Sequence, residues 1–175
     1  MEKIKKNYWQ YIVGFVVCFL FRLIPFKPPN IELILTAQMP FARFYGKFAG
    51  FSFAFFSIFL YDIFTNKLGI WSLITGLTYG LLGLFAVSYF KNKKNNAWDY
   101  AKFAIIGTIL YDAITGLSIG PLFFNQSFTQ ALVGQIPFTL LHLIGNVSFA
   151  LILSPAIYTY ILKNKKLESA SIITI

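Results

Sequence analysis

The chain has 175 residues, of which 57% are hydrophobic and 12% are charged, and its formal net charge is +9. This composition excludes an ordinary soluble domain, in which about 25% of residues are charged. A membrane-spanning helix needs about 20 mostly apolar residues, so this length allows roughly six spans with short connections and no separate soluble domain. The basic residues cluster at the ends of apolar runs, which indicates membrane topology and not a nucleic-acid partner.

The chain has a single cysteine, Cys18, and a single histidine, His142. These are too few for a zinc or iron–sulfur site, so we expect no metal, no cofactor and no disulfide within the chain. The N-terminus resembles a secretory signal, because lysines precede an apolar run, but it lacks a small-residue cleavage site. We interpret it as a retained first span.

Apolar runs predict six spans, at about residues 8–25, 31–45, 47–64, 68–90, 98–116 and 131–162. The second run is short and contains Gln38 and Pro40, so its hydropathy alone also fits a re-entrant segment. Six crossings place twelve of the fifteen basic residues on one side of the membrane. Five crossings would move the lysines at 91–94 and 163–166 to the side opposite the N-terminus. We therefore predict an all-α integral membrane bundle of six transmembrane helices, forming one domain over residues 1–175, with both termini in the cytoplasm.

Two segments of the chain repeat one another at an offset of 50 residues. Residues 53–65 and 103–115 align without gaps and are identical at six of thirteen positions. The third and fifth spans run in the same direction, so this similarity indicates a direct repeat of a helical unit, as is common in transporters. The alternative is low-complexity membrane sequence shared by chance.

Each copy of the repeat ends in Leu-Tyr-Asp-x-x-Thr, which places Asp62 and Asp112 at the outward ends of their helices. A carboxylate exposed to lipid is costly, so each should face protein, water or a ligand. Two roles remain open: each aspartate could cap the loop that follows it, or it could bind a ligand.

Four polar residues recur along the last span. Gln135, Thr139, His142 and Asn146 are spaced by four, three and four residues, which places them on one helix face that should turn inward. His142 could form an interhelical hydrogen bond that holds the bundle together, or it could contact a ligand at mid-depth.

The sequence contains no phosphate-binding loop Gly-x-x-x-x-Gly-Lys-Ser/Thr, no His-Glu-x-x-His and no Gly-x-Ser-x-Gly. Energy for any transport should therefore come from another subunit or from a gradient. Two membrane aspartates are also typical of intramembrane aspartyl proteases, but those enzymes need Gly-x-Gly-Asp where this chain has Ile109-Leu-Tyr-Asp112. We expect no enzymatic activity. A gradient-driven transporter or a membrane-assembly factor is the main competing class.

The sequence resembles the substrate-binding S component of an energy-coupling factor transporter, a small six-helix prokaryotic membrane protein, over roughly residues 10–162. The resemblance rests on Arg22-Leu-Ile-Pro-x-x-Pro-Pro-Asn30, on the short second helix, on Leu60-Tyr-Asp-x-x-Thr-x-x-x-Gly-Ile-Trp71 and on Tyr111-Asp112. It implies a subunit of the prokaryotic cell membrane that captures a vitamin or other micronutrient from outside. It also implies association with a transmembrane coupling subunit and two cytoplasmic ATPase subunits. The alanine-rich face that the family presents to the coupling subunit is represented in the first span only by Gly14 and Cys18.

The resemblance further implies a ligand near the outer end of the bundle, between the loops at 26–32, 65–71 and 117–130 and the last three helices. The substrate-binding residues that it suggests are Asn30, Glu32, Asp62, Trp71, Asp112, Gln135, His142 and Asn146. An aromatic side chain such as Trp71 would stack on a flat ring, and the carboxylates and amides would fix its orientation. The Phe123-Phe-Asn-Gln126 segment would form a lid.

Overall fold

The computed structural model describes residues 8–26 and 31–164, and within these ranges the chain forms eight helical elements. They are α1 (Tyr8–Leu23), α2 (Ile34–Tyr45), α3 (Lys47–Phe64), α4 (Ile70–Phe90), α5 (Ala97–Gly116), α6 (Ile119–Phe123), α7 (Phe128–Ala156) and the π-helix η1 (Ile157–Leu162). The six predicted runs are confirmed as α1 to α5 and as α7 with η1. The short helix α6, in the loop between α5 and α7, was not predicted.

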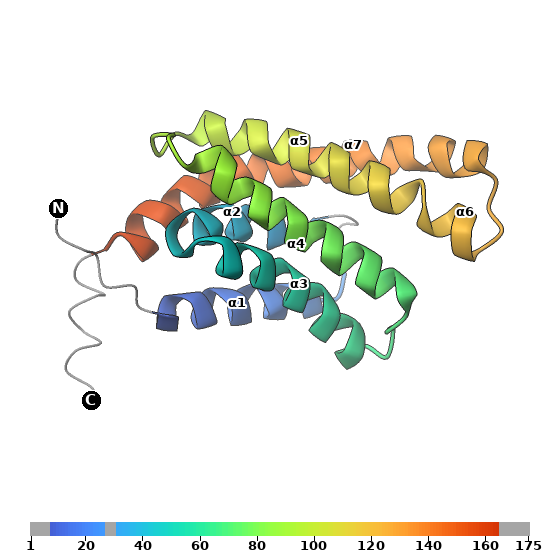
Figure 1. Ribbon diagram of the computed structural model, residues 1–175, viewed down its shortest axis with the longest axis horizontal. Helices are drawn as coiled ribbons and strands as arrows, with labels where there is room; N and C mark the ends of the chain where they lie inside the picture. Colours follow the sequence, from blue (N-terminus) through green and yellow to red (C-terminus); the bar gives the residue numbers. More distant parts are fainter. Residues whose placement is uncertain (1–7, 27–30, 165–175) are drawn as a thin grey trace.

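Four described helical runs are long and apolar enough to cross a membrane: Lys47–Phe64, Ile70–Phe90, Ala97–Phe123 and Phe128–Leu162. Helix α1 is a shorter apolar helix of 16 residues. The first residue of α1 and the last of η1 lie at the same end of the bundle (Figure 1), as an even number of passes requires. The cytoplasmic side of that end stays a prediction, and the lysines at 3–6 and at 165–166 lie outside the described residues.

Helix α2 lies at the centre of the bundle, with α1, α3, α4, α5, α7 and η1 packed around it. Ten of its twelve residues are buried. At about 1.5 Å per residue it is much shorter than the hydrocarbon core of a bilayer. Its surroundings are therefore protein and not lipid, which explains why its hydropathy is weak for a span. Gly46 alone separates it from α3, with a φ of 99° that favours glycine.

The amide of Gln38 joins α2 to both α3 and α4. Its Nε2 donates hydrogen bonds to the carbonyl oxygens of Gly50, at 2.8 Å, and Tyr79, at 2.7 Å. Next to it α3 and α4 touch through their backbones, because a Cβ on Gly83 would lie 1.9 Å from the carbonyl oxygen of Gly50. The polar residue that made the second run ambiguous thus binds helix carbonyls at the core.

The small residues of α1 face the interior. A Cβ on Gly14 would lie 2.3 Å from the ring of Phe41 on α2, and Cys18 is buried. Gly14 and Cys18, which stand in place of the family's alanine-rich face, are therefore turned toward the bundle interior and not toward its surface. The exposed residues of α1 are apolar and consist of Tyr8, Trp9, Ile12, Val13, Val16, Val17 and Leu20.

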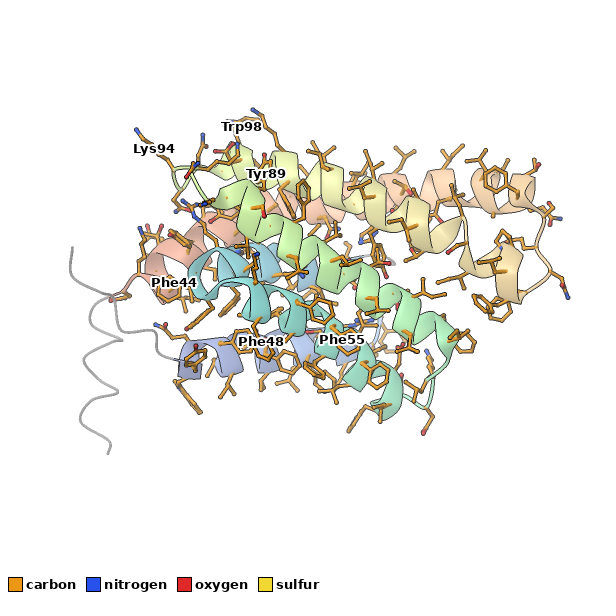
Figure 2. All side chains as sticks on the ribbon, viewed as in Figure 1. Phe44, Phe48, Phe55, Tyr89, Lys94 and Trp98 are labelled. Atoms are coloured by element: carbon orange, nitrogen blue, oxygen red, sulfur yellow. The ribbon has the colours of Figure 1, made fainter. Side chains whose placement is uncertain are left out.

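Arg43 of α2 contacts several other elements at the end of the bundle where the turn joins α4 to α5. Its guanidinium donates hydrogen bonds to the Tyr100 hydroxyl at 3.2 Å and to the Lys93 carbonyl oxygen, and it stacks on the ring of Tyr158 at 4.3 Å. Beside it, a hydrogen bond from Lys93 to Asp99 at 2.9 Å raises the pKa of that lysine. Figure 2 shows Lys94 and Trp98 pointing away from the bundle at this turn, as expected for residues at a membrane surface.

The longer helices form two pairs. Helix α3 packs along α4, and α5 packs along α7, whereas α4 and α5 share fewer contacts. The pairs lie close at the α4–α5 turn and diverge toward the opposite end, where α6 and the start of α7 extend beyond α3 and α4 (Figure 1). Polar side chains that lie between the pairs are therefore candidates for a functional site.

Candidate ligand-binding site

Two polar contacts connect α5 to α7. The Asp112 carboxylate oxygen Oδ1 lies 2.9 Å from His142 Nδ1, and Asn146 Nδ2 donates a hydrogen bond to Thr108 Oγ1 at 2.8 Å. Asp112 and Thr108 are four residues apart, as are His142 and Asn146, so the two contacts lie one helical turn apart. All four side chains are buried. The interhelical hydrogen bond that was one of the two roles expected for His142 is therefore present.

Aromatic residues of α4 and α5 complete this cluster. The Tyr79 hydroxyl lies 3.5 Å from His142 Nε2, and the Tyr79 ring lies 4.0 Å from the ring of Tyr111. Tyr111 also meets the imidazole of His142 edge to face, with ring centroids 5.9 Å apart. Three helices thus converge on His142.

Two buried acceptors of the cluster, Asp112 Oδ2 and Asn146 Oδ1, have no hydrogen-bond partner among the described residues. Leaving such an atom buried and unpaired costs about 1–3 kcal/mol. Polar groups left unsatisfied in an apolar bundle are typical of a site that receives hydrogen bonds from a ligand.

A second set of charged residues approaches from α1 and from the segment before α2. Arg22 Nη2 lies 3.6 Å from Glu32 Oε1, and the Arg22 guanidinium lies 4.2 Å above the ring of Tyr61. Ile34 and Leu35, which follow Glu32 in the chain, lie in the same buried cluster as Tyr79, and Tyr111 packs against that cluster. Arg22 and Glu32 therefore lie beside the region that contains Tyr79 and Tyr111.

Sequence reasoning missed Arg22, Tyr79, Tyr111 and Thr108 as site residues. Arg22 entered the topology assignment and the motif that carries the family resemblance, but neither gave it a ligand contact. Thr108 lies four residues before Asp112, a spacing that could have identified it. Tyr111 directly precedes Asp112 in the repeated motif, which could have identified it, whereas no spacing distinguishes Tyr79 among the many aromatic residues.

The structure separates the two aspartates. Asp112 is 1% exposed and pairs with His142, so its predicted alternative role as a loop cap is wrong. Asp62 is half-buried, and the amide of Gly69 donates to Ser72 Oγ at 3.2 Å rather than to Asp62. The loop after α3 is instead closed by backbone carbonyls, among them that of Asp62, which accepts from Lys67 N at 2.7 Å.

Trp71 lies in the first turn of α4, beside the segment expected to form a lid. Its ring lies 5.7 Å from that of Phe124, and its Nε1 donates to the Lys67 carbonyl oxygen at 3.0 Å. The Gly120 carbonyl oxygen accepts from Phe124 N at 3.0 Å and from Gln126 N at 3.3 Å, which makes this segment a compact turn. Asn30, the remaining candidate of the first loop, lies outside the described residues.

The polar stripe of α7 divides into two halves. His142 and Asn146 are buried, as predicted, but Gln135 and Thr139 are only half-buried, and Gln135 Nε2 donates to Thr139 Oγ1 at 3.1 Å. All four nevertheless lie on the face of α7 that turns toward α5, as expected, because the Gln135 side chain packs against Gly116 of α5. Gln135 and Thr139 line an open hollow of about 290 Å³ between α5 and α7, together with Ile109, Ala113, Leu117, Leu132, Ile136 and Leu140.

The arrangement of the described residues suits binding rather than metal chemistry. No group of three or more His, Cys, Asp or Glu side chains in the described part of the chain is placed to hold a metal ion. A polar, flat small molecule can be held by these groups, which are hydrogen-bond donors and acceptors, two carboxylates, one guanidinium and several aromatic rings.

Comparison with known proteins gives one family. The family model described as "ECF-type riboflavin transporter, S component" matches residues 12–110, which is more than half of the chain. No curated protein and no solved structure matches the chain. Arg22, Glu32 and Tyr79 lie inside the matched range, whereas Asp112 and α7 lie beyond it.

Proposed function

The chain belongs to the S components of ECF-type transporters, and on this basis we propose that it captures riboflavin at the outer face of a prokaryotic cell membrane. We propose further that it delivers this ligand to a transmembrane coupling subunit and two cytoplasmic ATPase subunits, the partners that the resemblance implies. Capture by a binding subunit is the function of the family. The choice of riboflavin comes from the description of the matching family.

The single observation that carries the proposal is the pair of unpartnered buried acceptors, Asp112 Oδ2 and Asn146 Oδ1, on facing helices. Polar groups inside membrane bundles are costly and mark ligand or ion sites. Riboflavin has one imide N–H and several hydroxyl groups, which can donate hydrogen bonds to such acceptors. Its flat ring suits the aromatic residues that surround them, Tyr79 and Tyr111.

The full set of proposed contacts is broader than this pair. It consists of Asn30, Glu32, Asp62, Trp71, Asp112, Gln135, His142 and Asn146, with Phe123 to Gln126 as the lid. The contact between Trp71 and Phe124 supports a joint role of α4 and the lid segment.

The proposal is tested by titrating the purified protein with riboflavin and measuring the quenching of flavin fluorescence. We expect saturable binding that Asn146→Ala weakens about tenfold or more, because the ligand then loses its hydrogen-bond acceptor. Ser154→Ala is the matched control, since it removes another buried hydrogen bond of α7, to the Thr36 carbonyl oxygen at 2.7 Å. A folded protein that does not quench riboflavin, or an Asn146→Ala variant that binds as the parent does, would refute the proposal.

The partners are tested separately. Riboflavin should enter proteoliposomes only when the coupling and ATPase subunits are reconstituted with the chain and ATP is supplied. Uptake by the chain alone, driven by an ion gradient, would establish the competing class of gradient-driven transporter.

A further inference from the structure

We infer that Arg22 is a ligand-contacting residue that holds a carbonyl group of a neutral heterocycle. The inference rests on the proposed function, because it assumes that the ligand occupies the region bounded by Arg22, Tyr79 and Asp112. Neither the sequence analysis nor the family match assigns a role to this arginine.

The hydrogen-bonding capacity of Arg22 is largely unused. A guanidinium carries five N–H donors. The side chain is only 10% exposed, and its Nε and Nη1 atoms are buried without a hydrogen-bond partner among the described residues. The nearest carboxylate, that of Glu32, lies 3.6 Å from Nη2, which is too far for a normal hydrogen bond. Within the described part of the chain, this buried guanidinium therefore has donors that can bind an acceptor on a ligand.

The surroundings of Arg22 hold its planar group in a fixed orientation. The Tyr61 ring lies 4.2 Å from the guanidinium carbon, and Glu32 attracts the Nη2 side. Stacking on an aromatic ring fixes the plane of the guanidinium, and the ion pair fixes its rotation within that plane. The unused edge, formed by Nε and Nη1, therefore has a defined direction before any ligand binds.

Charge selects the class of group that this edge accepts. Arginine binds carbonyl, carboxylate and phosphate oxygens. The Glu32 carboxylate already faces Arg22 at 3.6 Å, so one negative charge lies next to this edge. An anion bound there would be repelled by Glu32, whereas a neutral carbonyl would not be. We therefore assign Arg22 to the carbonyl edge of the riboflavin ring, with Asp112 and Asn146 accepting from the N–H and hydroxyl groups.

The test measures the affinity of the full-length protein for riboflavin, for lumiflavin, which replaces the hydroxylated side chain by a methyl group, and for the phosphorylated flavin FMN. Arg22→Ala should weaken riboflavin and lumiflavin by the same factor, about tenfold or more, because both keep the ring carbonyls. Arg22→Lys keeps the charge but loses the planar fork, so it should also weaken both. Lys91→Ala is the control, since Lys91 is an exposed cation at the C-terminal end of α4, away from the proposed site, and should leave binding unchanged.

Each remaining outcome overturns a defined part. If the parent protein does not bind riboflavin, the proposed function fails. If the parent binds riboflavin and a folded Arg22→Ala or Arg22→Lys variant binds it equally well, only the role of Arg22 fails. If Arg22→Ala weakens riboflavin but not lumiflavin, Arg22 contacts the hydroxylated side chain of the ligand and not its ring. If the parent protein binds FMN more tightly than riboflavin, Arg22 binds a phosphate group and not a neutral carbonyl. Size-exclusion chromatography of each variant establishes that it is folded.

Discussion

Helices α3 and α4 meet through their backbones, whereas α5 and α7 meet through polar side chains. In the first pair, the site of closest approach is Gly50 against Gly83. In the second pair, Thr108 binds Asn146 and Asp112 binds His142. Close backbone packing leaves no space for a ligand, but contacts between polar side chains can be opened or shared. We propose that α5 and α7 contribute most of the ligand contacts and that α3 and α4 form the more rigid part of the bundle.

The repeated motif shows the same division at the level of single residues. Thr65 and Thr115 each donate a hydrogen bond to the carbonyl oxygen of the tyrosine four residues earlier, both at 2.8 Å. The tyrosines differ, since Tyr61 stacks on Arg22 and Tyr111 on Tyr79. The two copies therefore share a local backbone feature, and their neighbours determine what each does.

The largest expected effect is on stability, at the closest backbone contact. Gly83→Ala places a methyl group against the Gly50 carbonyl, which already accepts from Gln38, so we expect a loss of about 3 kcal/mol. Gly107→Ala on α5 is the control, because its Cβ would meet Leu35 at an ordinary 3.5 Å. Thermal unfolding in detergent measures both. Equal melting temperatures for the two variants would contradict the assignment of the backbone contact to α3 and α4.

The second effect is on binding and compares the two aspartates. Asp112→Asn keeps the shape of the side chain but removes the charged acceptor, which should weaken riboflavin binding by about 10- to 100-fold. Asp62→Asn, at the half-buried position of the other copy, should change the affinity by about threefold or less. Titration of flavin fluorescence measures both. If the two variants lose affinity equally, the two copies contribute equally to the site.

A smaller effect is expected at Tyr61, whose ring orients Arg22. Tyr61→Leu removes the aromatic face below the guanidinium, so riboflavin binding should weaken by about three- to tenfold. Tyr61→Phe keeps that face and should bind as the parent does. Similar losses for both substitutions would show that the hydroxyl, and not the ring, is the important group.

The smallest effect is expected at the threonine hydrogen bond that both copies of the repeat share. Thr65→Val and Thr115→Val each remove a hydrogen bond to a helix carbonyl that already belongs to the helix ladder, so each should change stability by about 0.5 kcal/mol or less. The measurement is again thermal unfolding. A clearly larger loss for one of the two would show that the shared feature also depends on tertiary neighbours.

The helical runs could be predicted because lipid imposes length and hydropathy on each span, and their bounds differ from the structure by only a few residues. The pairing of Asp112 with His142 could not be predicted, because the rotation of one helix against another depends on packing that no single helix shows. The role of Gln38 depends on carbonyls of two other helices. The charge of Arg22 fits the predicted topology whether its side chain faces solvent or the core, so only the structure distinguishes these two orientations.

The buried position of α2 has a consequence for biosynthesis. A ribosome makes α2 before it makes either acceptor of the Gln38 amide, and the more distant one, Tyr79, follows 41 residues later. A nascent chain that ends before Tyr79 therefore exposes part of this amide to lipid or to the translocation channel. The centre of the bundle becomes stable only after the fourth helix has been inserted, so the order of synthesis and the order of assembly differ.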